Sequence, residues 1–190
     1  TIGAKVTEIE NYAFDNCQAL ESITIPDNVR GLGARPFGSC YNLQTAVIGN
    51  GVLEIKNNTF WDCTNLTDVT IGNSVMGIGE SAFANCKLTS ITIPEKVTWI
   101  GYHAFADCTK LQNISFPDSV ETIGTGVIDG CIELTSVRIG KNATIFDIED
   151  DFAFECPNLQ NINISSKNEK HVVVDGVLYD LKTKTLGSIF

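Results

Sequence analysis

Cysteine recurs along this chain at a nearly constant interval, and this regularity constrains the fold more than any other feature. The seven cysteines are Cys17, Cys40, Cys63, Cys86, Cys108, Cys131 and Cys156, at intervals of 23, 23, 23, 22, 23 and 25 residues. Disulfide frameworks use an even number of cysteines, and zinc sites use close pairs that this chain lacks. A fixed period is typical of a structural repeat that buries one cysteine per unit. We therefore expect free thiols.

Other apolar residues recur in phase with the cysteines. A phenylalanine stands three residues before five of them, at Phe14, Phe37, Phe60, Phe83 and Phe105, and Ile128 takes this place once. A leucine follows each cysteine, and two alternating apolar residues follow each leucine. The consensus is L-x-x-I-x-I-[PG]-x-x-V-x-x-I-G-x-x-A-F-x-x-C-x-x, and it predicts a stack of similar coils.

The L-x-x-I-x-I segment alternates apolar and polar residues, which indicates a strand with one buried face. A proline or glycine ends it at once, because proline cannot donate to a ladder and glycine allows the chain to turn. We expect one short strand per unit, and a turn of 3₁₀ or α-helix or a compact loop from valine to cysteine. A single unit cannot bury its inner face, so stacked units form a parallel sheet over a continuous core.

The L-x-x-I-x-I segment followed by A-F-x-x-C at this period resembles the BspA-type leucine-rich repeats of bacterial and protist surface proteins. The resemblance covers about residues 1–164. It implies a repeat solenoid, a leucine-rich-repeat arc with the parallel β-sheet on its concave face and short 3₁₀ or helical turns or loops on its convex side. It also implies display at the cell surface or secretion, protein binding and adhesion.

The two ends depart from the repeat. Residues 1–164 are expected to hold a partial first unit and then about seven units, with an uncapped N-terminal edge through which copies could associate. Residues 165–190 predict a β-hairpin with a type I′ turn at Asp175-Gly176 and a third strand through Leu186. This segment is expected to be a cap or a link to further repeats.

Polar residues at the outward strand positions predict a stripe of hydroxyls and amides on the concave face. Its candidate binding residues are Ser22, Thr24, Thr45, Asp68, Thr70, Ser90, Thr92, Asn113, Ser115 and Arg138. One interpretation is that serine and threonine simply suit an exposed strand. The other is that a concave array of hydrogen-bonding groups is a docking face for a partner.

Aromatic residues supply a second candidate surface. Trp99 and Trp61 occupy repeat slots that hold small or polar residues in other units, and these slots are expected to face water. Together with Tyr102, they could anchor a partner on the flank of the solenoid, because tryptophan and tyrosine are favoured at interfaces. Alternatively, the rings lie flat over neighbouring coils.

The remaining composition argues against other classes of function. The net charge of -10 disfavours binding to nucleic acid or anionic lipid, and no apolar run reaches the length of a membrane-spanning helix. His103 and His171 match no ligand or catalytic pattern and are expected to be structural. No enzyme, cofactor or metal site is expected. The acidic segment 147–155 could either bind calcium or form a solvated bulge.

Two functions of different classes follow. The first is a non-enzymatic adhesion module of a cell-surface or secreted protein, which binds a protein, or alternatively a glycan, through the stripe or the aromatic flank. The second is a structural spacer that carries another domain and has no ligand of its own.

Overall fold

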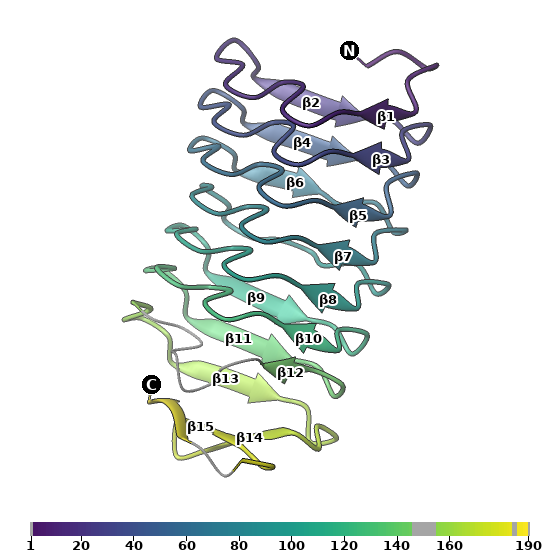
Figure 1. Cartoon of the computed structure of the whole chain (residues 1–190). Helices are drawn as coiled ribbons and strands as arrows, with labels where there is room; N and C mark the ends of the chain where they lie inside the picture. The colour runs from purple at the N-terminus through teal and green to yellow at the C-terminus, as the bar shows by residue number, and fades with distance from the viewer. Residues whose placement is uncertain (1, 146–154, 184–185, 190) are drawn as a thin grey trace.

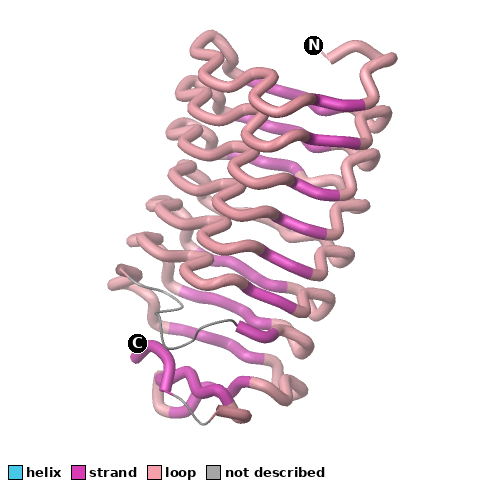
Figure 2. Tube along the Cα trace, viewed as in Figure 1, coloured by secondary structure: helices cyan, strands magenta, loops and turns pink. Residues whose placement is uncertain are grey.

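The chain folds into a parallel β-solenoid followed by an antiparallel hairpin. The computed structural model describes residues 2–145, 155–183 and 186–189. In Figure 1 the coils stack along one axis, from the N-terminus at one end to the C-terminal strands at the other. Figure 2 shows strands joined by turns, and the described residues contain no helix. Within that part of the chain there is accordingly no apolar helix long enough to cross a membrane.

One face is a ladder of longer strands that come from the L-x-x-I-x-I segments. The strands of this long-strand face are β2 (Ser22–Ile25), β4 (Thr45–Ile48), β6 (Asp68–Thr70), β9 (Asn113–Phe116), β11 (Ser136–Ile139) and β13 (Asn161–Ile164). Neighbours pair in parallel and in repeat register, so that Ile23 stands opposite Ala46 and Ile25 opposite Ile48. The predicted parallel sheet is confirmed.

The long-strand face is interrupted in one coil. Segment 90–93 carries the same pattern, yet it pairs as a strand with neither neighbour, and the face divides into two sheets, β2-β4-β6 and β9-β11-β13. The interruption follows a shortened turn, because one residue instead of two separates Cys86 from Leu88. Lys87, which precedes the leucine, donates its backbone N–H to Leu66 O at 3.0 Å, whereas elsewhere the donor follows the leucine. The missing residue thus shifts the hydrogen-bond register of this coil.

A second parallel ladder runs along the solenoid, and the prediction of one strand per unit was wrong. Its two-residue strands come from the V-x-x-I segments, and they are β1 (Glu8–Ile9), β3 (Gly31–Leu32), β5 (Glu54–Ile55), β7 (Gly77–Ile78), β8 (Trp99–Ile100), β10 (Thr122–Ile123) and β12 (Thr144–Ile145). Two residues are too few to show a period-2 pattern in the sequence. Only stacking of the coils supplies their backbone partners.

The A-F-x-x-C segments form tight turns that also hydrogen-bond from coil to coil. Of the two structures expected for them, a helical turn or a compact loop, the compact loop is therefore the one that forms. The backbone N–H groups of Asn58, Phe60 and Asp62 donate to the next coil at 2.8 to 2.9 Å. Asn58 and Asp62 have φ of 58° and 60°, a left-handed conformation that asparagine and aspartate tolerate better than most residues. The turns therefore extend the backbone bonding around the coil.

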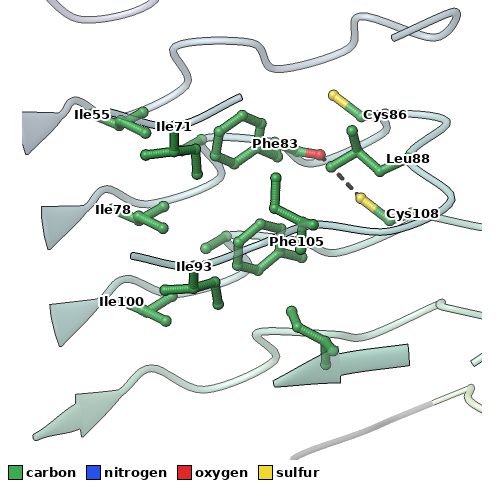
Figure 3. Close-up of a cluster of buried hydrophobic side chains, with 14 of the residues drawn as sticks. Ile55, Ile71, Ile78, Phe83, Cys86, Leu88, Ile93, Ile100, Phe105 and Cys108 are labelled. Atoms are coloured by element: carbon green, nitrogen blue, oxygen red, sulfur yellow. Dashed lines mark hydrogen bonds between the residues drawn. The ribbon is translucent and has the colours of Figure 1, made fainter. Parts of the chain in front are cut away.

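The core is made of identical side chains stacked in columns (Figure 3). Phe14, Phe37, Phe60, Phe83 and Phe105 stack with ring centroids 5.3 to 5.5 Å apart and planes within 13° of parallel. The leucines beside them, from Leu43 to Leu134, are fully buried. Each coil thus buries its inner face against its two neighbours, as the periodicity predicts.

The buried cysteines serve as hydrogen-bond donors as well as small apolar side chains. The thiol of Cys108 donates to Phe83 O of the preceding coil at 3.2 Å, as Figure 3 shows, and Cys63 and Cys86 do the same to Phe37 O and Phe60 O. The recurring cysteine is explained by this bond, because a buried carbonyl oxygen has capacity for a second donor.

The C-terminal segment forms the predicted hairpin. The strands β14 (His171–Val174), β15 (Val177–Asp180) and β16 (Leu186–Ile189) are antiparallel. Asp175 and Gly176, between β14 and β15, both have positive φ, of 50° and 77°, as a type I′ turn requires.

Side chains from this segment bond the backbone of the last coil. Asn168 Nδ2 donates to Gly140 O at 2.9 Å and Ala143 O at 3.1 Å, and His171 Nε2 accepts from the Ile145 N–H at 2.9 Å. Both side chains are buried. They satisfy backbone groups of Gly140, Ala143 and Ile145.

Candidate binding surfaces

The predicted polar stripe lies on the long-strand face in two columns on each sheet. On the first sheet Ser22, Thr45 and Asp68 stand opposite one another, and so do Thr24, Val47 and Thr70. On the second sheet Ser136 lies between Asn113 and Asn161, and Arg138 lies between Ser115 and Asn163. All ten candidate residues of the stripe are exposed, whereas Ser136 between them is half-buried. The stacking therefore brings these side chains together on one face.

Ser90 and Thr92 lie between the two sheets, in the coil that is not paired as a strand. Their side chains are exposed, but their backbone does not continue the ladder. The stripe therefore consists of two three-stranded patches with an irregular coil between them.

Two charges mark the two patches. Asp68, in the first, accepts a hydrogen bond from the Thr67 hydroxyl at 2.7 Å. Arg138, in the second, has its Nη2 3.4 Å from an Asp118 carboxylate oxygen. Because both members of the Arg138 pair are half exposed, solvent screens this ion pair and it adds little to stability. The rest of the stripe is uncharged and has hydrogen-bonding capacity open to solvent.

Of the two alternatives for the tryptophans, the structure favours rings that lie over neighbouring coils, because both residues are half-buried and each ring contacts the preceding coil. Trp61 lies beneath the Arg35 guanidinium, whose carbon is 4.4 Å from the ring centroid. Arg35 is in turn fixed by Asp15 at 2.8 Å and by the Ser39 hydroxyl at 3.0 Å. Trp61 is thus part of a packed cluster with Arg35, Asp15 and Ser39, whose members no sequence pattern predicts.

Trp99 lies over the glycine of the preceding coil. A Cβ atom at Gly77 would stand 2.2 to 2.4 Å from atoms of the Trp99 ring, so only glycine fits beneath it. Tyr102, three residues further on, is 49% exposed. Trp99 and Tyr102 line a common groove of 320 Å³, and Trp61 does not contribute to it. The predicted aromatic flank is therefore two separate features, the Trp61 cluster and the groove lined by Trp99 and Tyr102. The sequence signal for the groove is a glycine, Gly77, in the repeat slot that Trp99 occupies one coil later.

The two histidines lie in different environments, one exposed and one buried. His103 is exposed, and its Nδ1 lies 3.8 Å from an Asp129 carboxylate oxygen. His171 is buried at the base of the hairpin, and burial lowers its pKa, with the Asp180 carboxylate acting in the opposite direction. Its neutral ring is the form that can accept the Ile145 N–H.

Burial raises the pKa of most of the buried thiols and so suppresses their reactivity. All seven cysteines are free, and six of them are buried. Burial raises the pKa of Cys108 to about 12 and that of Cys156 to about 11. Since the thiolate is the reactive and metal-binding form, these cysteines are held in the unreactive thiol form.

Among the described residues, no three histidine, cysteine, aspartate or glutamate side chains cluster as metal ligands do. The acidic segment considered for calcium, 147–155, lies outside the described residues except for Glu155, which is exposed.

The N-terminal end of the solenoid carries an apolar pocket of 390 Å³. Ile2, Val6, Phe14 and Leu20 line it, beside β1 and the first long strand. Phe14 and Leu20 are only half-buried, whereas their counterparts in the next coil, Phe37 and Leu43, are fully buried. The apolar side chains at this end of the described coils are therefore less covered than their counterparts one coil further on.

Comparison with protein-family models assigns the repeat to a family. The model of the BspA type leucine rich repeat region matches residues 1–98 and 77–173, with six copies. The chain belongs to this family. A comparison with curated proteins found no match.

Solved structures agree with this assignment. A leucine-rich repeat protein from Bacteroides ovatus is 35% identical, with a TM-score of 0.78 over 87% of this chain and 44% of that protein. A leucine-rich repeat protein of T. pallidum shares the fold at 24% identity and a TM-score of 0.70, over 86% of this chain and 77% of that one. The pneumococcal vaccine antigen PcpA shares the fold at 16% identity and a TM-score of 0.69, over 95% of this chain and 51% of that protein. This chain thus spans less than half of the Bacteroides ovatus protein.

Proposed function

We propose that this BspA-type repeat chain is a non-enzymatic interaction module of a cell-surface or secreted protein, and that it binds a protein partner in adhesion. The observation that carries this proposal is the stripe on the long-strand face, where stacked strands present exposed hydroxyls and amides in register. Repeat scaffolds use such extended faces for binding because their stability does not depend on those side chains. The family supplies the scaffold, and the stripe supplies the candidate site.

Several observations favour a protein over other partners. The long-strand face is mostly uncharged, with Asp68 and Arg138 as the two charges of its stripe, and it offers many short side chains that lose little entropy on binding. The net charge of -10 argues against nucleic acid. We further propose that residues 165–190 cap the last coil, supported by the bonds of Asn168 and His171 to its backbone.

The alternative is a structural spacer without a ligand. The parallel phenylalanine stack and the unbroken core favour it, because they make the solenoid stiff enough to hold another domain at a distance. A spacer tolerates any surface substitution that preserves the core.

Thr70→Arg and Thr92→Arg separate the two proposals, since each places bulk and charge in the stripe. Leu53→Arg is the matched control, because Leu53 is exposed directly before β5, on the ladder of two-residue strands, and the substitution adds the same charge. The measurement is binding to a panel of purified extracellular-matrix and serum proteins, together with the melting temperature. An interaction module loses binding in both stripe variants and keeps it in Leu53→Arg. Equal binding by all four proteins, or no binding by any, would favour the spacer.

A further inference from the structure

The groove beside Trp99 lies on the ladder of two-residue strands and is separate from the polar stripe. Trp99 of β8 and Thr122 of β10 form one wall, and Asn57, Glu80 and Tyr102 form the other. The members of each wall occupy equivalent positions in successive coils, so the groove runs along the solenoid axis.

The floor of the groove is main chain. Gly101 and Gly124 lie along it, and the coils approach each other closely there, because a Cβ at either position would stand 2.6 Å from a backbone nitrogen of the preceding coil. Larger residues at these positions are therefore excluded. The close approach keeps the floor low between the two walls.

The aromatic wall is an exception to the repeat. The slot of Trp99 holds Glu8, Gly31, Glu54, Gly77, Thr122 and Thr144 in the other coils, and only here does it hold an aromatic ring. Packing on Gly77 fixes the ring, and the part of the ring that is not packed there lines the groove. A rigid aromatic surface costs little entropy when a ligand covers it.

The polar groups of the groove suit a ligand that is rich in hydroxyls. Glu80 offers a carboxylate that only accepts hydrogen bonds, and Thr122 offers a hydroxyl that both donates and accepts. Asn57 Oδ1 is held by the Glu80 N–H at 3.1 Å, which orients its side-chain amide. The lining contains no lysine, arginine or histidine, so an acidic ligand finds no positive partner and meets the Glu80 carboxylate.

The backbone around the groove argues against a peptide as the ligand. An extended peptide gains affinity by adding a strand to a free sheet edge. Here β8 is paired on one side with β7 and on the other with β10, so neither edge is open. A ligand in this groove therefore binds to side chains and not to the backbone of a free strand edge.

We propose that this groove binds a neutral oligosaccharide. A sugar ring has an apolar C–H face that packs on Trp99 and Tyr102, and it has hydroxyls at its rim that reach Asn57, Glu80 and Thr122. The volume of 320 Å³ is at the lower end of the range for small-ligand sites, about 300–1,000 Å³. The groove therefore holds a short stretch of sugar chain, and its open ends along the axis let the chain continue.

Tryptophan fluorescence tests the proposal directly, because the chain has two tryptophans. Trp61→Ala removes the second fluorophore and introduces the residue that Ala84 supplies in the same slot of the next coil, so that emission reports on Trp99 alone. This variant is titrated with the hexasaccharides of cellulose, laminarin, mannan and chitin, and with hexagalacturonic acid as the acidic comparison. We expect a saturable change with at least one neutral hexasaccharide and a weaker response to the acidic one.

Repeat-matched substitutions locate the site. Trp99→Thr and Tyr102→Thr introduce the residues that Thr122 and Thr125 supply in the next coil, and each is expected to weaken binding in calorimetry about tenfold or more. Trp61→Ala is expected to leave the affinity unchanged. Equal melting temperatures show that the variants fold.

The inference is overturned if none of the four neutral hexasaccharides binds, or if binding survives both Trp99→Thr and Tyr102→Thr. Because the groove and the stripe lie on different ladders, Thr70→Arg is expected to leave saccharide binding intact. Failure of this inference and failure of the proposed function therefore give different results.

Discussion

The central coils and the C-terminal region of the solenoid differ in how their buried groups are covered. In the centre each coil is covered by a copy of itself, and Phe83 packs between Phe60 and Phe105 with centroid distances of 5.5 Å on both sides. Beside β12, near the C-terminal end of the described coils, the side chains of Asn168 and His171 bond backbone groups instead. The central coils thus fill the core with repeated apolar side chains, whereas this region uses specific polar bonds.

The largest effect is expected in the centre. Phe83→Ala removes a ring that neighbours cover on both faces, and the stacked coils cannot collapse into the hole, so we expect a loss of about 3–5 kcal/mol in unfolding free energy. Phe14→Ala, at the half-exposed end of the same column, is expected to cost less. Urea unfolding of both variants measures the difference. Equal losses would show that the column is not packed as described.

The C-terminal end is expected to depend on one bond. His171→Ala leaves the Ile145 N–H buried without its acceptor, which costs about 1–3 kcal/mol. Val174→Ala, at an exposed position on the same strand, is expected to change stability by less than about 0.5 kcal/mol. Hydrogen exchange at Ile145 should accelerate in the first variant alone. Unchanged protection in His171→Ala would contradict the role of the imidazole.

Acid is expected to weaken the C-terminal end before the centre. Burial lowers the pKa of His171 below its ordinary value of 6.5, so the unfolded chain binds its proton first as the pH falls. Its contribution is complete above about pH 6.5 and is lost as the pH falls through the lower pKa of the folded state.

Besides burial, two charged groups act on the pKa of His171. The Asp180 carboxylate raises it, and the Lys170 ammonium lowers it. The pKa of Asp180 is itself lowered, mainly by the backbone N–H groups of Thr183 and Lys182, so its contribution is lost only in stronger acid. Unfolding free energies at pH 7.5 and 5.0 check the prediction. The decrease should be smaller in His171→Gln, and an equal decrease would assign it to other groups.

The smallest effect concerns the thiols, where no change in stability is involved. Native protein should react with a thiol reagent quickly at Cys17 alone, because Cys17 is half-buried and the other six are buried. After unfolding without reductant, seven thiols should react. Fewer than five would mean that some cysteines are bridged, and rapid native labelling of several would mean that the coils open.

The groove and the stripe differ in how far the sequence could predict them. Thr70 and Thr92 were placed on an exposed strand face because alternation fixes which side of a strand each residue occupies. For Trp99 and Trp61 the sequence left two alternatives open, rings that face water or rings that lie over neighbouring coils, because their burial depends on residues one coil away, Gly77 and Arg35. No pattern within a single unit carries that information.

The sequence by itself determined the coil: its length, its buried Phe, Leu and Cys positions and its outward strand residues all follow from a period that one unit repeats. The tertiary structure decided everything that involves two coils at once. It paired the two-residue strands of the second ladder, gave the six buried thiols their carbonyl partners in the preceding coil, and laid Trp99 over Gly77 to form the groove. The physical reason is that periodicity records which side of a coil is buried, whereas contacts between coils depend on the exact residues that the stack places opposite one another.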